Sequence, residues 1–246
     1  MTQGDLALAA DSSTRHLSYL ETGKSQPSRD MIARLAECLN IPLRDQNALL
    51  LAAGYAPTFQ ERSLAGLQAA KTAIDSVLRA HLPYPAFAVD RHWNVVLSNG
   101  ALPQLYEDCS EELMRQVNAV RIILHPAGMA PRIVNYAEWR DHTLTVLRQQ
   151  IETRADPVIQ GLLAEIRGYP IPPRAQVPQA FDASQRLATP LQIATRFGTV
   201  SFLGTVTVFG TPNDVTLAEL ALEMLFPADD QTVEIVKRMA AELPSP

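Results

Sequence analysis

The chain has 246 residues, of which 47% are hydrophobic and 19% charged, and its 21 basic and 26 acidic residues give a net charge of -5. This length suffices for one large domain or for a small domain joined to a medium one, and either arrangement buries a core. The negative net charge excludes a protein that binds nucleic acid or anionic membrane through a global positive field.

Apolar residues up to about Gly54 fall into four short groups at helical spacing. The groups are Leu6, Ala7 and Ala10; Leu17 and Leu20; Ile32, Leu35, Ala36 and Leu39; and Leu49, Leu50 and Ala53. Ser13 and Ser28 stand where helix N-caps are expected, and Gly23 and Gly54 suit the left-handed residue that ends a helix. The sequence therefore predicts an all-α domain of four short helices over residues 1–57.

Residues 58–82 are expected to link this domain to the rest of the chain. An apolar stripe predicts one continuous helix from Gln60 to Leu82. The stripe runs through Leu64, Leu67, Ala70, Ile74 and Leu78. Two prolines, Pro83 and Pro85, end the helix because they cannot continue its hydrogen bonding.

Residues 83–246 change to a mixed pattern that predicts an α+β domain. In chain order we expect strands at 86–90 and 93–97, helices at 100–106, 135–152 and 157–167, a hairpin turning at 196–198, a helix from 216 and a last helix from 227. The helices at 135 and 216 each start with the spacing of a capping box. The helix from 216 would carry an apolar stripe of Leu217, Leu220, Ala221 and Met224. Five prolines between residues 168 and 190 predict an exposed loop with a mobile tip.

The run SSTRHLSYLETGKSQPSRDMIARLAECLNI, residues 12–41, resembles the helix-turn-helix of the Xre/Cro-like repressor family. Its second helix lies in the major groove in that family, where each base pair shows a distinct pattern of donors and acceptors. The resemblance implies contacts with an operator in double-stranded DNA from Gln3, Thr14, Arg15, His16, Ser18, Tyr19 and Lys24. The alternative is that this short polar helix is only a solvated surface.

The first segment departs from that family's pattern in three respects. The family's unit has five helices, and its first helix has no counterpart before Gln3, so we expect a start codon placed too far downstream or a truncated gene. Asp11 replaces the usual turn glycine, and Ser12 replaces an apolar residue. Residues 1–54 hold five basic and six acidic side chains, a net charge of -1, so a monomer should bind DNA weakly and we expect a homodimer.

Three stretches of the second part resemble the ligand-binding domain of MmyB-like transcription regulators. They are PAFAVDRHWNVVLSNGA, NAVRIILHPAGMAPRIVNYAEWRDH and GTVSFLGTVTVFGTPNDVTLAELALEMLFPAD. The resemblance implies a PAS-like antiparallel sheet with packed helices around an apolar pocket. It also implies that the pocket binds a fatty acid or a similar apolar molecule.

A pocket for such an amphiphile needs apolar walls and one or two polar anchors. Candidate wall residues are Leu124, Trp139, Phe202 and Val206, and candidate anchors for a carboxylate are Arg121, His125 and Asn135. Each anchor has a structural alternative. Asn135 suits a helix cap, His125 a bond to the backbone, and Arg121 an exposed surface position, while Trp139 suits a core.

The sequence gives no argument for an enzyme or a metal site. It contains no phosphate-binding glycine turn or nucleophile elbow, its histidines lack metal-ligand spacing, and Cys38 and Cys109 have no short-spaced partners. The N-terminus lacks a signal peptide and no stretch is long and apolar enough for a membrane span. We therefore expect a cytoplasmic transcription regulator in which the linker helix transmits the effector's binding. The alternative is a lipid-binding or interaction protein that has lost DNA binding.

Overall fold

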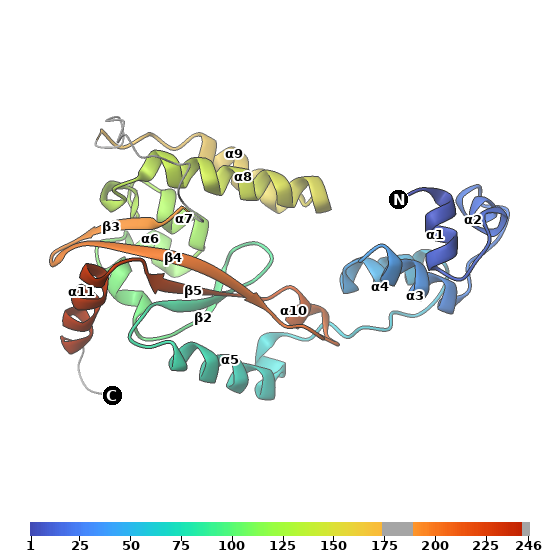
Figure 1. Ribbon diagram of the computed structural model, residues 1–246, viewed down its shortest axis with the longest axis horizontal. Coiled ribbons are helices and arrows are strands. Elements are labelled where there is room, and N and C mark those ends of the chain that lie inside the picture. The colour runs from blue at the N-terminus through green and yellow to red at the C-terminus, as the bar shows by residue number, and fades with distance from the viewer. Residues whose placement is uncertain (174–188, 243–246) are drawn as a thin grey trace. The chain divides into compact units, whose positions relative to one another are not determined.

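The computed structural model describes residues 1–173 and 189–242, and it divides into two compact units (Figure 1). The first contains residues 1–68 and 209–219, and the second contains residues 69–208 and 220–246. This division differs from the expected linear one, because residues 209–219 belong with the first unit although they connect two strands of the second. Most of the loop expected at 168–190 lies outside the described residues.

The first unit begins with the four predicted helices, which are confirmed. They are α1 (Gln3–Ala9), α2 (Thr14–Glu21), α3 (Arg29–Cys38) and α4 (Leu43–Ala52). Ser13 accepts a hydrogen bond from the backbone N–H of His16 at 3.1 Å, and Ser28 caps α3 in the same way. Asp11 has a φ of 48°, so this residue supplies the left-handed turn where the family pattern has glycine. Buried side chains at the predicted helical spacing form the core, among them Ala7, Leu17, Ile32, Ala36 and Leu50.

The single helix predicted from Gln60 to Leu82 is wrong. Residues 60–67 contain only the short 3₁₀ helix η1 (Leu64–Gly66), and helix α5 spans Gln68–Ala80. Partners from the later segment hold these residues: the N–H of Val215 donates to the carbonyl of Gln60 at 2.9 Å, and the hydroxyl of Thr216 donates to the carbonyl of Arg62 at 2.6 Å. These long-range hydrogen bonds override the local helical periodicity.

The long helix predicted from residue 216 is also wrong. Helix α10 covers only Val215–Ala218, and the chain then forms strand β5 (Ala221–Pro227). The true N-cap is Asp214, which accepts from the N–H of Thr216 at 3.0 Å. The residues after α10 become a strand because they pair with neighbours on both sides, and these two ladders satisfy the backbone groups that a helix would satisfy internally.

The second unit is built on an antiparallel sheet with the strand order β2-β1-β5-β4-β3. The other strands are β1 (Ala86–Val89), β2 (Val95–Ser98), β3 (Leu191–Thr195) and β4 (Gly198–Val208). The first strand pair and the hairpin that turns at residues 196–197 confirm the sequence prediction. Strand β5 lies between β1 and β4, so residues from distant parts of the sequence become neighbours on its two sides.

Helices cover both faces of this sheet (Figure 1). They are η2 (Leu102–Tyr106), α6 (Glu111–Arg115), α7 (Ala119–Leu124), η3 (Ala130–Arg132), α8 (Tyr136–Arg154), α9 (Pro157–Arg167) and α11 (Asp230–Ala241). Helices α8 and α9 lie on one side of the sheet and α5 lies on the other. Side chains alternate between the faces along a strand, so Phe87 and Val89 of β1 join the main apolar core while Ala86 and Ala88 point toward the side of α5.

Candidate functional site

Helix α2 presents an aromatic residue with two cations beside it. The Nε of Arg15 donates to the hydroxyl of Tyr19 at 3.1 Å, and the Arg15 guanidinium lies 5.4 Å from the centre of the Tyr19 ring. The ammonium of Lys24 lies 5.9 Å from the same ring. All three side chains are exposed. Opposite charge attracts DNA phosphates, so the -1 charge of residues 1–54 does not describe this local surface.

The other expected DNA contacts lie on or beside the same helix. Thr14 is exposed in its first turn, and His16 and Ser18 are partly buried. Gln3 is exposed, and its Nε2 donates to Oε2 of Glu21 at 2.7 Å. This hydrogen bond joins the start of α1 to the end of α2, so Gln3 helps to fix the orientation of the exposed helix.

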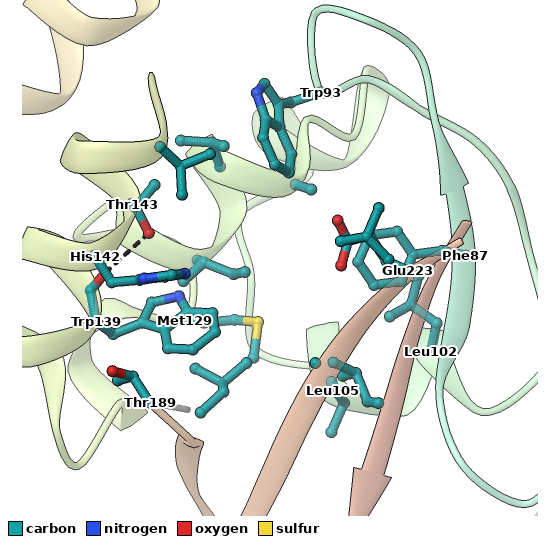
Figure 2. Close-up of a pocket in the computed structure, with 18 of the residues that line it drawn as sticks. Phe87, Trp93, Leu102, Leu105, Met129, Trp139, His142, Thr143, Thr189 and Glu223 are labelled. Atoms are coloured by element: carbon teal, nitrogen blue, oxygen red, sulfur yellow. Dashed lines mark hydrogen bonds between the residues drawn. The ribbon is translucent and has the colours of Figure 1, made fainter. Parts of the chain in front are cut away.

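The second unit contains a cavity of about 670 Å³ between the sheet and helix α8 (Figure 2). Its sheet side is formed by Phe87 of β1, Gly204 and Val206 of β4, and Glu223 and Leu225 of β5. The remaining lining residues are Trp93, Leu102, Leu105, Tyr106, Ala119, Val120, Ile123, Met129, Glu138, Trp139, His142, Thr143, Val146, Thr189 and Leu191. Its volume and mainly apolar walls are those of a site for a small organic ligand.

Glu223 places a carboxyl group on the sheet side of this cavity. No described residue donates a hydrogen bond to it, and burial raises the pKa of the Glu223 carboxyl to about 7. Figure 2 shows His142 and Trp139 of α8 across the cavity from this carboxyl. The hydroxyl of Thr143 is already used, because it donates to the carbonyl of Trp139 at 2.9 Å. Lysine and arginine are absent from the described lining.

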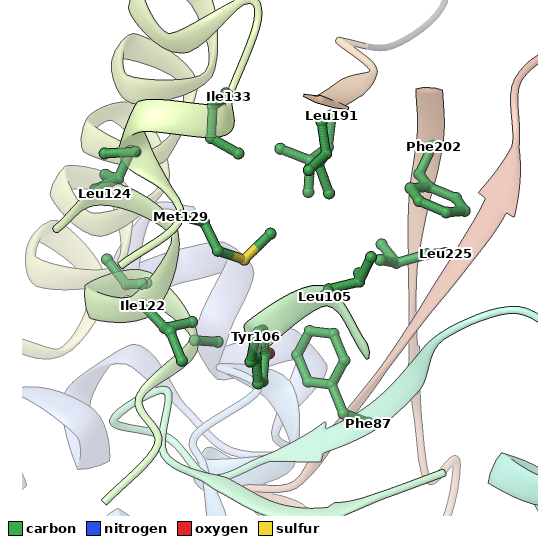
Figure 3. Packing of buried hydrophobic residues seen from close by; sticks show 14 of the residues in the cluster. Phe87, Leu105, Tyr106, Ile122, Leu124, Met129, Ile133, Leu191, Phe202 and Leu225 are labelled. Carbon is green, nitrogen blue, oxygen red and sulfur yellow. The ribbon is translucent and has the colours of Figure 1, made fainter. Parts of the chain in front are cut away.

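Two of the four wall residues expected from the sequence line the cavity, namely Trp139 and Val206. The other two, Leu124 and Phe202, are fully buried in the packed core, as Figure 3 shows. Their apolar character was therefore read correctly, but their side chains stabilise the fold and do not contact the cavity.

Two of the expected anchors lie outside the cavity lining. Arg121 forms an ion pair with Glu165, with its Nη2 at 2.8 Å from Oε2, and this bond raises the pKa of the guanidinium. The Nδ1 of His125 accepts a hydrogen bond from the backbone N–H of Ala127 at 3.0 Å, and its ring packs edge-on against Tyr169. Both side chains are therefore engaged by protein groups away from the cavity.

Asn135 is the third expected anchor, and it is buried between α8 and β3. Its Nδ2 donates to the carbonyl of Pro190 at 2.8 Å and to Oε2 of Glu138 at 3.1 Å, and its Oδ1 accepts from the N–H of Gln192 at 3.1 Å. It precedes α8 as predicted, but its side chain makes no capping hydrogen bond to the helix backbone. These contacts join a helix to a strand.

The sequence reasoning did not identify Glu223, His142 or the aromatic Phe87 and Tyr106 as cavity residues. Glu223 was placed on a predicted helix, so its direction was wrong. The available signal was a single acid inside the alternating segment ALEMLF, because a charged residue on the buried side of a strand is unusual unless it has a function.

An exposed helix of a small helical unit, together with a separate sheet unit that encloses an apolar cavity, defines the class of ligand-regulated DNA-binding proteins. The chain belongs to the family of the MmyB-like transcription regulator ligand binding domain, whose model matches residues 70–239. A helix-turn-helix model matches residues 1–46. No curated protein matches the chain. The two families make it a ligand-regulated, DNA-binding transcription regulator, and both are regulatory rather than enzymatic.

Two further findings bear on other classes of function. Within residues 1–173 and 189–242, histidine, cysteine and acidic side chains form no cluster that could hold a metal ion. Of the helices in this part of the chain, none has the length and apolar character needed to cross a membrane.

Proposed function

We propose that this protein is a one-component regulator that binds an operator through helix α2 and binds a small apolar effector in the second unit. The observation that carries the proposal is the cavity of about 670 Å³ in a chain that also exposes the Arg15, Tyr19 and Lys24 cluster. The regulator acts as a cytoplasmic homodimer, which doubles the phosphate contacts of two weakly charged helical units. The sheet is of the PAS-like type that the resemblance implies.

Arg15→Ala is expected to weaken operator binding by about 1–3 kcal/mol, because a bidentate guanidinium contact to guanine contributes this much discrimination. The matched control is Arg34→Ala, which removes the same charge from an exposed position on α3. Fluorescence anisotropy with operator and random DNA at several salt concentrations measures both effects. Equal losses for the two variants on both DNAs would show that Arg15 contributes only general charge.

The effector is proposed to be an amphiphile with an apolar body that fills the cavity. A fatty acid, which the family resemblance implies, satisfies this requirement through its chain. The lining supports the apolar part of that expectation more than the carboxylate part, because Arg121 and His125 are engaged elsewhere.

Gly204→Leu is expected to block the cavity without disturbing the fold. A Cβ built at Gly204 meets only the side chain of Leu225, at 3.9 Å, and Gly204 lines the cavity. Its side chain would therefore occupy the space of the ligand. The affinity for any cavity ligand should fall by about tenfold or more, as expected for overpacking by 1–3 kcal/mol.

Isothermal titration with the variant and the unmodified protein measures this loss. Leu203→Ala on the opposite side of β4 is the control, because Leu203 is exposed and does not line the cavity. Unchanged affinity in Gly204→Leu would place the ligand elsewhere.

Residues 209–219 are proposed to transmit the effector's binding to the first unit, in place of the continuous linker helix. Val206 pairs with Glu223 and Val208 pairs with Ala221, so the ladder that forms the cavity floor continues to the start of this segment. Within the first unit, Arg44 of α4 then holds Glu219, with Nε 2.8 Å from Oε1. A shift of β4 against β5 would therefore move a segment that is bonded to the DNA-reading helices.

The second candidate function is a ligand-binding protein that does not bind DNA. The observation that favours it is the net charge of -1 for residues 1–54, because neutralised phosphates supply most non-specific affinity. A mobility-shift assay at low salt separates the two. Ligand binding without any DNA binding, by either specific or random sequences, would favour this second function.

A further inference from the structure

We propose that the ligand of the cavity is a basic amphiphile, an apolar body with one protonated amine that binds the carboxylate of Glu223 among aromatic rings. This inference rests on the proposed function only in that the cavity is the effector site. It differs from the expectation of a fatty acid in the charge of the head group. Three independent features of the lining support it.

The first feature is the position of Glu223 on the sheet. It pairs with Phe87 of β1 and with Val206 of β4, and residues directly opposite each other in antiparallel strands share one face. All three line the cavity. Because no described residue donates a hydrogen bond to the carboxyl, a ligand that carries a donor would satisfy a polar group that is otherwise left without a partner.

The second feature is the sign of the charges around the cavity. The lining residues that can carry a charge are Glu223 of β5, Glu138 and His142 of α8, and Tyr106 of η2. Burial raises the pKa of the Tyr106 phenol, so this group stays neutral. With two acids and no lysine or arginine in the described lining, a carboxylate head would meet charges of its own sign, whereas an ammonium would form an ion pair.

The third feature is the set of aromatic rings, which are Phe87, Trp93, Tyr106 and Trp139. The negative face of an aromatic ring attracts a cation, and cages of such rings recognise alkylated ammonium groups. Figure 2 shows Phe87 beside Glu223 and Trp139 on the opposite wall, so rings and carboxyl face the same space. Apolar contacts with the same rings would hold the body of the ligand.

The protonation of Glu223 gives the binding a defined pH dependence. Since its carboxyl has a pKa of about 7 in the empty cavity, the ionised fraction rises about tenfold between about pH 6 and pH 8. An alkylamine stays protonated over this range, so its affinity should rise with pH. An alkanoate needs a protonated Glu223, so its affinity should fall. His142→Gln tests the other lining group that can titrate here and should leave the rise for the amine in place.

The probes are decylamine, 1-decanol and decanoate, which share one chain and differ in the head group. The chain contains two tryptophans, and both line the cavity, so quenching of tryptophan fluorescence reports occupancy directly. The full-length protein is titrated below the concentration at which each probe aggregates. The variants are Glu223→Gln, which keeps the shape of the side chain, and Glu152→Gln, an exposed control on α8 outside the lining.

At about pH 8, decylamine should bind about tenfold or more tightly than decanol and decanoate, the effect of one charge-assisted hydrogen bond. Glu223→Gln should remove this preference and its pH dependence, and Glu152→Gln should keep both. Preferred binding of decanoate, or a decylamine preference that survives in Glu223→Gln, would overturn the proposed head group while the cavity stands as a ligand site. No quenching by any probe would overturn the cavity assignment as well.

Discussion

Arg44→Ala is expected to leave effector binding intact and to remove the influence of the effector on operator affinity. The Arg44 guanidinium contacts two acids: its Nη2 lies 2.5 Å from Oε1 of Glu61, and its Nε lies 2.8 Å from Oε1 of Glu219. Glu219 is the last residue of the 209–219 segment, and Glu61 belongs to the chain that leaves α4. One side chain therefore fixes the DNA-reading helices to the segment that continues the cavity floor.

The position of Arg62 supports the same conclusion. Its Nε lies 2.9 Å from Oδ2 of Asp214, whose side chain is fully buried and also caps α10. The 209–219 segment is therefore held to the first unit at both Asp214 and Glu219. Coupling between two ligands typically amounts to about 5- to 150-fold in affinity. In Arg44→Ala the effector should change operator affinity by less than about twofold, because the bonded path at Glu219 is gone.

Operator affinity measured with and without saturating effector gives this coupling. A double-mutant cycle with Glu219→Gln shows whether the two residues act together, since both single variants and the double variant should lose the same coupling. Arg34→Ala is the control for the loss of one positive charge from the first unit. Full coupling in Arg44→Ala would mean that the effector acts through another route, such as residues 60–68.

The first unit was predictable because its signals are local. Helix periodicity, Ser13 and Ser28 as caps and Gly23 as a left-handed residue all act within a few positions of each other, and the structure confirms each one. Even the replacement of glycine by Asp11 was readable, since aspartate tolerates the left-handed region.

The failures at residues 60–67 and 216–224 share one cause. Both segments carry apolar side chains at helical spacing, but each is paired with residues more than 100 positions away. Gln60 pairs with Asp214, and Ala86 of β1 pairs with Met224 of β5. Local periodicity cannot report such partners, so tertiary hydrogen bonds decided between strand and helix.

The ligand anchors were missed for a related reason. Arg121, His125 and Asn135 lie close together in the sequence, but the fold directs them to Glu165, to the local backbone and to β3. The acid that does face the cavity, Glu223, becomes a cavity residue only because β5 lies between β1 and β4. Convergence in space depends on sheet order, which the sequence pattern did not contain.

Glu223→Gln is expected to stabilise the ligand-free protein at pH 8 by about 2 kcal/mol and by less than about 1 kcal/mol near pH 5. The carboxyl has its ordinary pKa of 4.5 when unfolded and about 7 when folded, so the folded state binds more protons between these values. Stability is therefore lost as the pH rises through this window, and the full cost of the buried charge is present above pH 7. The shift corresponds to about 3 kcal/mol, and partial access to water reduces this figure.

Urea unfolding followed by tryptophan fluorescence measures the effect in the second unit, because Trp93 and Trp139 both belong to it. The stability difference between Glu223→Gln and the unmodified protein should grow from pH 5 to pH 8, while Glu152→Gln should show no such trend. Saturating decylamine should reverse the order at pH 8, since the amine compensates the charge only when Glu223 is present. A constant difference across the pH range would mean that the Glu223 carboxyl is solvated and does not face an apolar cavity.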